Sequence, residues 1–138
     1  MPNKKDLDRF RGEMGETIVI YELMKRGWNV SRNAGGQGHD LRAVSEDKLI
    51  TRLIEVKTTD PKLRTGKTKN QLTVVLSPAE RQNASHCIYY IHGFATFYVI
   101  PHAKFPSSGS ITVRVGKDGS LTEGGMFNDF KDEWDGLK

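Results

Sequence analysis

The chain has 138 residues, of which 36% are hydrophobic and 28% are charged, and its formal net charge is +4. This length and composition predict one soluble globular domain over residues 1–138, large enough to bury a core. The sequence has no apolar run near the roughly 18 residues of a membrane span and no signal-peptide pattern, which argues against a membrane or secreted protein.

The single cysteine, Cys87, has no partner for an internal disulfide and no metal-type spacing, so we expect a reducing, cytoplasmic setting. Charge is uneven along the chain. Residues 1–116 carry 18 Lys and Arg against 11 Asp and Glu, whereas residues 117–138 carry 3 against 6. A basic body suits an anionic partner, although many basic proteins have none.

The first expected element is a helix over residues 6–26, with Gly27 as a plausible C-cap. Its apolar residues recur at intervals of three and four, at Leu7, Phe10, Met14, Ile18 and Tyr21. Gly12 and Gly15 lie inside this helix, and each costs about 1 kcal/mol relative to alanine. That cost predicts close packing of the helix against a neighbouring element at these glycines.

Strands and one further helix follow, in an order typical of a mixed sheet with helices packed on it. Runs rich in β-branched and aromatic residues predict strands at 28–33, 39–45, 48–59, 71–76, 87–93, 95–101 and 111–115. A helix is expected over 77–86, because Ser77 as N-cap, Pro78 at the first position and Glu80 at the third form a capping box. The acidic extension at 117–138 carries aromatic residues spaced for a short helix or a docking strip, namely Phe127, Phe130 and Trp134.

The segment IEVKTT, residues 54–59, places two charges in an otherwise apolar strand. Side chains alternate along a strand, so Glu55 and Lys57 leave on one face while Ile54 and Val56 leave on the other. Unpaired buried charges are costly, so the two either meet partners in a core or line a wet cleft. A plain ion pair on a solvated face is the alternative interpretation.

If the strands at 39–45 and 48–59 pair, Asp40 and Glu55 converge at one end of the sheet. Two carboxylates with backbone carbonyl oxygens form a hard oxygen site, which suits Mg²⁺ and would also accept Mn²⁺. Such a metal can bind a scissile phosphate and lower the pKa of a bound water. The Lys57 ammonium can neutralise developing charge or orient the attacking water. A wet, anionic substrate site would then explain the charged pair.

The pattern of Asp40, a gap of 14 residues and then Glu55-Val56-Lys57 resembles the core motif of the PD-(D/E)XK nuclease superfamily. The segments GEMGE at 12–16 and LMKRGWNV at 23–30 resemble the first helix and strand of archaeal Holliday-junction resolvases and of Mrr-like or RecB-like nucleases. Glu16 has the spacing of their helix glutamate. The resemblance covers residues 7 to 60 well and the later elements only by their order, and His39 stands where the family has proline.

This resemblance implies a restriction-endonuclease-like α/β fold with an α-β-β-β-α-β core and a mixed central sheet. It also implies metal-dependent cleavage of DNA phosphodiester bonds. The implied catalytic residues are Glu16, Asp40, Glu55 and Lys57. The implied ligands of the Mg²⁺ are Asp40, Glu55, the backbone carbonyl of Val56 and, through a water, Glu16.

Other roles stay open. Glu13 is the rival of Glu16 on the first helix. His39 could contact phosphate or act as a base, or it could be a supporting loop residue. The basic loop supplies the best candidates for DNA-backbone contacts, or it is a solvated surface loop, with its cations at Lys62, Arg64, Lys67 and Lys69.

The expected partner is DNA. Because 138 residues leave no room for a separate sequence-reading domain, specificity is expected to come from loops or from a dimer that binds two strands, and a homodimer is the expected assembly. The function expected is a metal-dependent DNA endonuclease of junction-resolvase, restriction, homing or repair type, associated with intracellular DNA such as a nucleoid. A non-catalytic nucleic-acid-binding module with the same fold is the alternative, and a structural protein whose charged strand is only an ion pair is the third interpretation.

Overall fold

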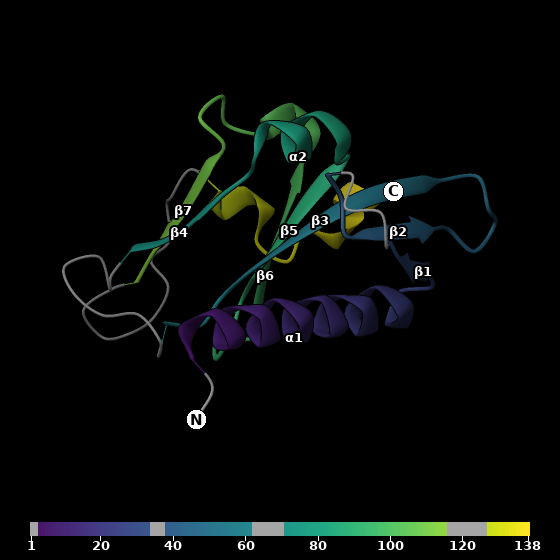
Figure 1. The fold of residues 1–138 in the computed structure, drawn as a ribbon. Coiled ribbons are helices and arrows are strands. Elements are labelled where there is room, and N and C mark those ends of the chain that lie inside the picture. Colours follow the sequence, from purple (N-terminus) through teal and green to yellow (C-terminus); the bar gives the residue numbers. More distant parts are fainter. Residues whose placement is uncertain (1–2, 34–37, 62–70, 116–126) are drawn as a thin grey trace.

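The computed structural model describes residues 3–33, 38–61, 71–115 and 127–138. Its fold is a five-stranded mixed sheet with one long helix on one face and a short helix and a second, two-stranded sheet on the other (Figure 1). The α/β class and the mixed sheet flanked by helices are as predicted. No helix among the described residues has the length and apolarity needed to span a membrane.

The long helix α1 (Lys4–Lys25) starts two residues earlier than predicted. Asn3 caps it, because its side chain accepts a hydrogen bond from the Asp6 amide at 2.9 Å. The helix ends at Lys25 with Arg26 as its C-cap, and Gly27 follows with a φ of 92°, the left-handed conformation that glycine adopts just after helix C-termini. Gly27 therefore marks the end of this helix, although the C-cap is Arg26 and not Gly27 as predicted.

The main sheet has the strand order β1-β2-β3-β5-β6. Only the β3–β5 pair is parallel among these described strands, and the other neighbours are antiparallel. The strands are β1 (Asn29–Arg32), β2 (Leu41–Val44), β3 (Thr51–Thr59), β5 (His86–Ile91) and β6 (Thr96–Pro101). The crossover from β3 to β5 contains the short helix α2 (Pro78–Asn83).

The strand predicted at 48–59 begins only at Thr51, because residues 45–50 form the turn between β2 and β3. Lys48 has a positive φ of 65°. The Asp47 carboxylate accepts hydrogen bonds from the Ser45 hydroxyl at 2.6 Å and from the Leu49 amide at 3.0 Å. A short polar side chain that binds nearby backbone in this way favours a turn over a strand.

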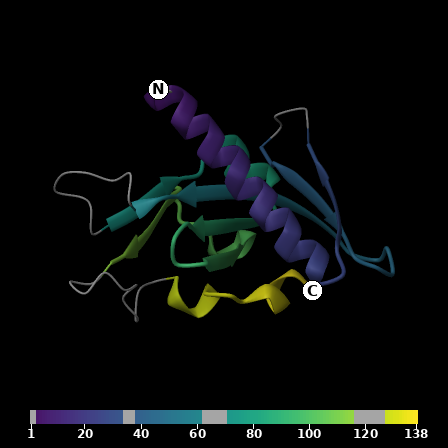
Figure 2. The ribbon, with the colours of Figure 1, turned by 90° about the horizontal axis from the view of Figure 1, so that it is seen from below.

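The strands β4 (Gln71–Val75) and β7 (Ser110–Arg114) pair with each other and form a separate sheet. This sheet packs against the face of β5 and β6 that carries Cys87, Tyr89 and Ile100, and it buries Leu72 and Ile111 there. The opposite face of the main sheet is covered by α1, which Figure 2 shows lying across the strands. The cluster under α1 includes Val19, Leu23, Ile54 and Val56.

The last described segment, residues 127–138, runs along β6 as two single 3-10 turns (Asn128–Phe130 and Trp134–Leu137). The Asp132 amide donates a hydrogen bond to the Phe97 carbonyl at 2.7 Å. Leu137 is fully buried, and its carbonyl accepts a hydrogen bond from Arg52 Nε at 2.7 Å. The segment therefore covers the outer edge of β6, which would otherwise present unpaired backbone groups.

Candidate active site

The candidate site lies where β2 begins and β3 continues past it. The last antiparallel pair is Leu41 with Ile54, and β3 then extends to Thr59 alongside β5. The Asp40 amide donates to the Ile54 carbonyl at 2.8 Å, and the Val56 amide donates to the Asp40 carboxylate at 2.8 Å. The Asp40 side chain therefore takes the place of a strand partner at the edge of β3.

The hydrogen bond from Val56 also fixes the direction of its carbonyl. In a β-strand the N–H and C=O of one residue point to the same neighbour, so the Val56 carbonyl points toward the side of β3 where Asp40 lies. The loop before Asp40 also packs closely against α2. Gly38 has a φ of 84°, and a Cβ there would stand 2.6 Å from the Ala79 carbonyl of α2.

Glu55 and Lys57 lie on the face of β3 opposite to Ile54 and Val56. The Lys57 Nζ is 3.6 Å from the Glu55 Oε1, and Glu55 is only 5% exposed. The pair therefore does not line an open wet cleft, nor does it sit on a solvated face. It is largely buried between β3 and α2, and so it meets a partner, as the burial of charge requires.

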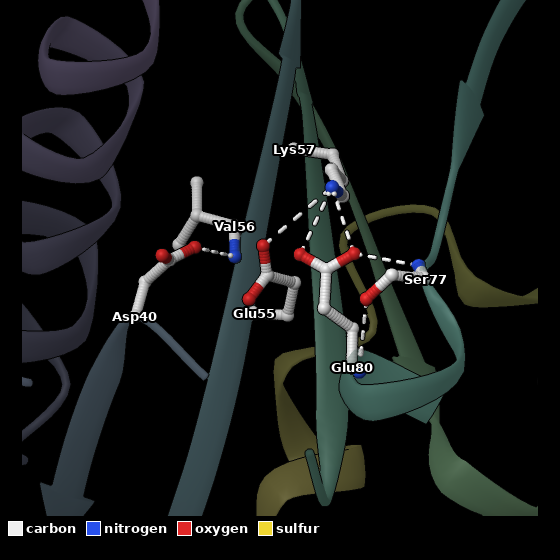
Figure 3. A network of polar contacts seen from close by, with 6 residues as sticks. All are labelled: Asp40, Glu55, Val56, Lys57, Ser77 and Glu80. Carbon is white, nitrogen blue, oxygen red and sulfur yellow. Dashed lines mark hydrogen bonds and ion pairs between the residues drawn. The ribbon is translucent and has the colours of Figure 1, made fainter. Parts of the chain in front are cut away.

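That partner is Glu80, for which the sequence pattern predicted only a role in the capping box of α2. The Lys57 Nζ lies 3.1 Å from both carboxylate oxygens of Glu80. The predicted capping box is present, because the Ser77 hydroxyl accepts from the Glu80 amide and the Glu80 carboxylate accepts from the Ser77 amide. Figure 3 shows Glu80 reaching from α2 to Lys57, with Asp40 on the other side of β3.

Several carboxylates lie close together in the site, and burial and mutual repulsion shift their pKa values. Burial, and then the neighbouring carboxylates of Glu80 and Asp40, raise the pKa of Glu55 strongly. Burial also works to raise the pKa of Glu80, but hydrogen bonds and the Lys57 ammonium outweigh it and hold that pKa low. Burial works to lower the pKa of Lys57, and the two glutamates outweigh it and raise that pKa. Ionisation of Glu55 is thus disfavoured by burial and by its neighbours, and a cation bound beside it would favour the charged form.

Glu16 reaches the site from the α1 side. Its pKa is raised by burial and then by the Asp40 carboxylate, while Arg32 opposes both effects. The Arg32 Nη1 lies 2.8 Å from the Glu16 Oε1, and its Nη2 donates to the Thr17 hydroxyl at 2.8 Å. The Asp40 charge therefore acts on Glu16, but Glu16 lies on the α1 side of β3, while Lys57 lies on the other side. Arg32 is a second residue that the sequence patterns did not single out.

The remaining candidates are placed as follows. Glu13 is exposed. His39 is half-buried, and its carbonyl accepts a hydrogen bond from the Asn33 side chain at 3.0 Å. The four cations of the basic loop lie outside the described residues, as Lys62, Arg64, Lys67 and Lys69. The described residues contain no group of three or more His, Cys, Asp or Glu side chains arranged to hold a metal. A metal between Asp40 and Glu55 would therefore need backbone oxygen and water as further ligands.

Comparison with known proteins points to one family. The family model described as PD-(D/E)XK endonuclease matches residues 7–131. The fold is similar to a bacterial homing endonuclease, with a TM-score of 0.73 and 19% identity over 98% of this chain and 91% of that one. It is also similar to Hjc, a Holliday junction resolvase from the archaeal hyperthermophile Archaeoglobus fulgidus, with a TM-score of 0.54 and 19% identity over 75% of this chain and 83% of that one. Comparison with curated protein sequences gives no match.

Proposed function

The chain belongs to the PD-(D/E)XK endonuclease family, and from this premise we propose that it is a metal-dependent DNA endonuclease that hydrolyses phosphodiester bonds. One observation supports this proposal more strongly than the others do. The Asp40 carboxylate accepts a hydrogen bond from the Val56 amide, the residue after Glu55 in β3, and its charge helps to raise the pKa of Glu55. Two carboxylates and a strand carbonyl then converge on one small region.

The residues fit a divalent cation by their chemistry. Asp40, Glu55 and the Val56 carbonyl would offer hard oxygen ligands, as Mg²⁺ and Mn²⁺ prefer. When bound, the cation would supply Lewis-acid charge to the scissile phosphate and lower the pKa of a water. Glu16, beside Asp40, would bind one of the waters that complete the coordination. Its ion pair with Arg32 holds the carboxylate in place for that task.

Lys57 would supply the positive charge that acts near the scissile phosphate. Its ammonium would orient the attacking water or neutralise charge that develops on the phosphate oxygens. His39 and the cations at 62–69 would contact the DNA backbone, with affinity that falls as salt rises. Such contacts carry no sequence information, so the DNA structure that is cut would be selected by shape or by a second copy of the chain.

We propose a homodimer, because two active sites are needed to cut both strands of a duplex in one complex. The outward face of α1 is the surface to test first. Four of its apolar side chains are 41–60% exposed, namely Leu7, Phe10, Tyr21 and Met24. Light scattering of the eluting protein would give the molar mass, and Phe10→Glu with Tyr21→Glu should reduce a dimer to a monomer. Location with intracellular DNA belongs to the same proposal.

A second candidate function is favoured by one observation. Lys57 is bound by Glu80 on the face of β3 away from Asp40. An ammonium held there permanently would leave a DNA-binding module without turnover. Glu55 and Lys57 would then stabilise the fold and take no part in catalysis.

One assay separates the two. The purified chain is incubated with linear duplex, single-stranded, flapped and four-way DNA in Mg²⁺, in Mn²⁺ and in EDTA, beside Lys57→Ala. Metal-dependent cleavage that Lys57→Ala loses supports the nuclease. Binding to DNA without cleavage in either metal contradicts it and supports the module.

A further inference from the structure

Glu80 and Lys57 form the best-defined polar contact on the α2 side of β3. The ammonium of Lys57 lies 3.1 Å from each Glu80 oxygen and 3.6 Å from the Glu55 Oε1. It is therefore held between carboxylates that come from two different elements, β3 and α2 (Figure 3). Such a three-point arrangement restricts where the ammonium can go.

Burial makes this contact stronger than a surface ion pair. The side chains of Lys57, Glu80 and Glu55 are 23%, 17% and 6% exposed. Their neighbours in β5 are Cys87 and Tyr89, and both are completely buried. Water screens charges poorly in such surroundings, whereas exposed pairs gain little.

Glu80 is itself fixed at its other end. Its Oε1 accepts a hydrogen bond from the Ser77 amide at 2.7 Å, and its own amide donates to the Ser77 hydroxyl at 3.2 Å. This reciprocal pair closes the first turn of α2 and ties the glutamate side chain to the helix start. The same oxygen that caps the helix therefore also binds Lys57.

A separate contact links α2 to the other half of the site. The Gly38 backbone packs against the Ala79 carbonyl and the Asn83 side chain, so closely that a Cβ on Gly38 would stand 2.6 Å and 2.9 Å from their atoms. Gly38 leads into Asp40 two residues later. The helix α2 therefore touches the approach to Asp40 and holds Lys57.

We infer that Glu80 is the positioning residue for Lys57 and that its carboxylate, anchored by the Ser77 backbone amide at the start of α2, sets the orientation of this ammonium. The inference rests on the proposed nuclease function and adds a residue to it. A lysine side chain has four rotatable bonds, and an ammonium that is already oriented loses less freedom when the reacting groups meet. Glu80 acts through Lys57 and does not itself touch the phosphate.

The test uses variants that separate the ion pair from the cap. Glu80→Gln removes the charge but keeps an amide oxygen that can accept from the Ser77 amide, since glutamine also serves in capping boxes. Ser77→Ala is the matched control, because it removes half of the capping box and leaves the Glu80 carboxylate beside Lys57. Thermal unfolding of both variants reports their folding, and Glu80→Asp, which keeps the charge but shortens the reach, replaces Glu80→Gln if that variant does not fold.

In steady-state cleavage with Mg²⁺ we expect Glu80→Gln to lower kcat by about 10- to 100-fold with little change in KM. Ser77→Ala should keep kcat within about twofold, since its effect is on helix stability. A kcat of Glu80→Gln equal to the wild-type value overturns the inference. A higher kcat overturns it too, because Glu80 would then restrain Lys57 away from the substrate.

A second measurement does not depend on cleavage. Proton–nitrogen NMR of lysine ammonium groups should show Lys57 as one slowly exchanging signal, assigned by its loss in Lys57→Arg. We expect Ser77→Ala to keep this signal and Glu80→Gln to lose it. If the wild type shows the signal but cuts no DNA, the nuclease proposal fails while the contact stands. If the wild type cuts DNA and Glu80→Gln keeps both signal and rate, only the role of Glu80 fails.

Discussion

Gly15 of α1 lies against Thr58 of β3, so closely that a Cβ built on Gly15 would overlap the Thr58 Oγ1 and stand 2.9 Å from the Thr58 Cβ. The contact lies two residues after Val56, on the face of β3 that α1 covers. It brings the next helix residue, Glu16, into electrostatic reach of Asp40. The absence of a side chain at Gly15 therefore sets the spacing between α1 and the candidate site.

We expect Gly15→Ala to lower the free energy of unfolding by about 1–3 kcal/mol, because the new methyl group must push α1 and β3 apart. Gly12→Ala is the matched control. A Cβ at Gly12 meets nothing within 4 Å, so alanine there should stabilise the helix by up to about 1 kcal/mol. Urea unfolding of both variants measures the difference, and equal stabilities would contradict the close approach.

The two glycines also show what the sequence could and could not predict. Each is costly in a helix, and the sequence predicted close packing at both. The structure bears this out at Gly15 alone, because a Cβ built on Gly12 would meet no other element within 4 Å. Helix propensity reports the cost of a glycine, but which side of the helix meets the sheet depends on tertiary packing.

The strand edge at Asp40 was predictable from local signals. The predicted pairing of the second and third strands is confirmed, and it brings Asp40 beside Glu55. The contact of Glu80 with Lys57 was not predictable in this way. A capping box accounts fully for a glutamate at that position, and the ion pair spans 23 residues of chain that include β4 and the start of α2.

Asp40→Asn should abolish metal-dependent cleavage while it keeps the fold. The amide oxygen of asparagine can still accept from the Val56 amide, so the edge of β3 stays capped. The lost charge removes a metal ligand worth several kcal/mol, or roughly 10³-fold in rate. Calorimetric titration with Mn²⁺ should show weaker binding, and Glu55→Gln should behave alike. Near wild-type cleavage by either variant would remove these carboxylates from the metal site.

Neutralising Lys62, Arg64, Lys67 and Lys69 together should weaken DNA binding and flatten its dependence on salt. Removing one phosphate contact reduces the slope of log affinity against log salt by about 0.9 on duplex DNA. Fluorescence anisotropy over a range of salt concentrations measures the slope. Neutralising Lys48 and Lys138, which are exposed at the other end of β3, is the control. A slope that changes equally in both variants would show that the basic loop has no special role.

Stability should fall as the pH drops below about 6.5, in part because of His86. Burial lowers the pKa of His86 in the folded chain, and Arg52 adds to this, while the hydrogen bond from Nε2 to the Gly136 carbonyl opposes it. The unfolded chain therefore binds this proton more readily, and the contribution is complete above the unfolded pKa and lost below it. His86→Gln should flatten the curve of unfolding free energy between pH 7 and pH 5. An unchanged curve would assign the acid sensitivity to other groups.

Glu16 and Glu13 provide the last comparison, because the two acids lie about 60° apart around α1 and face different surroundings. Glu16 neighbours Asp40 and is held by Arg32, whereas Glu13 is exposed. If Glu16 holds a metal-bound water, its loss should slow cleavage about 10- to 100-fold without removing the metal, as for groups that orient ligands. We therefore expect Glu16→Gln to lower kcat by that amount and Glu13→Gln to leave it nearly unchanged.

A loss of folding stability should not account for the difference in cleavage between the Glu16 and Glu13 variants. The ion pair of Glu16 with Arg32 is partly exposed, so its loss should change the free energy of unfolding by less than about 1 kcal/mol. Arg32→Gln supplies a further control, because it frees the Glu16 carboxylate without removing it. Mn²⁺ affinity should stay close to wild type in all three variants, because Asp40 and Glu55 remain. Equal losses of cleavage in Glu13→Gln and Glu16→Gln would show that α1 contributes charge to the site and no placed carboxylate.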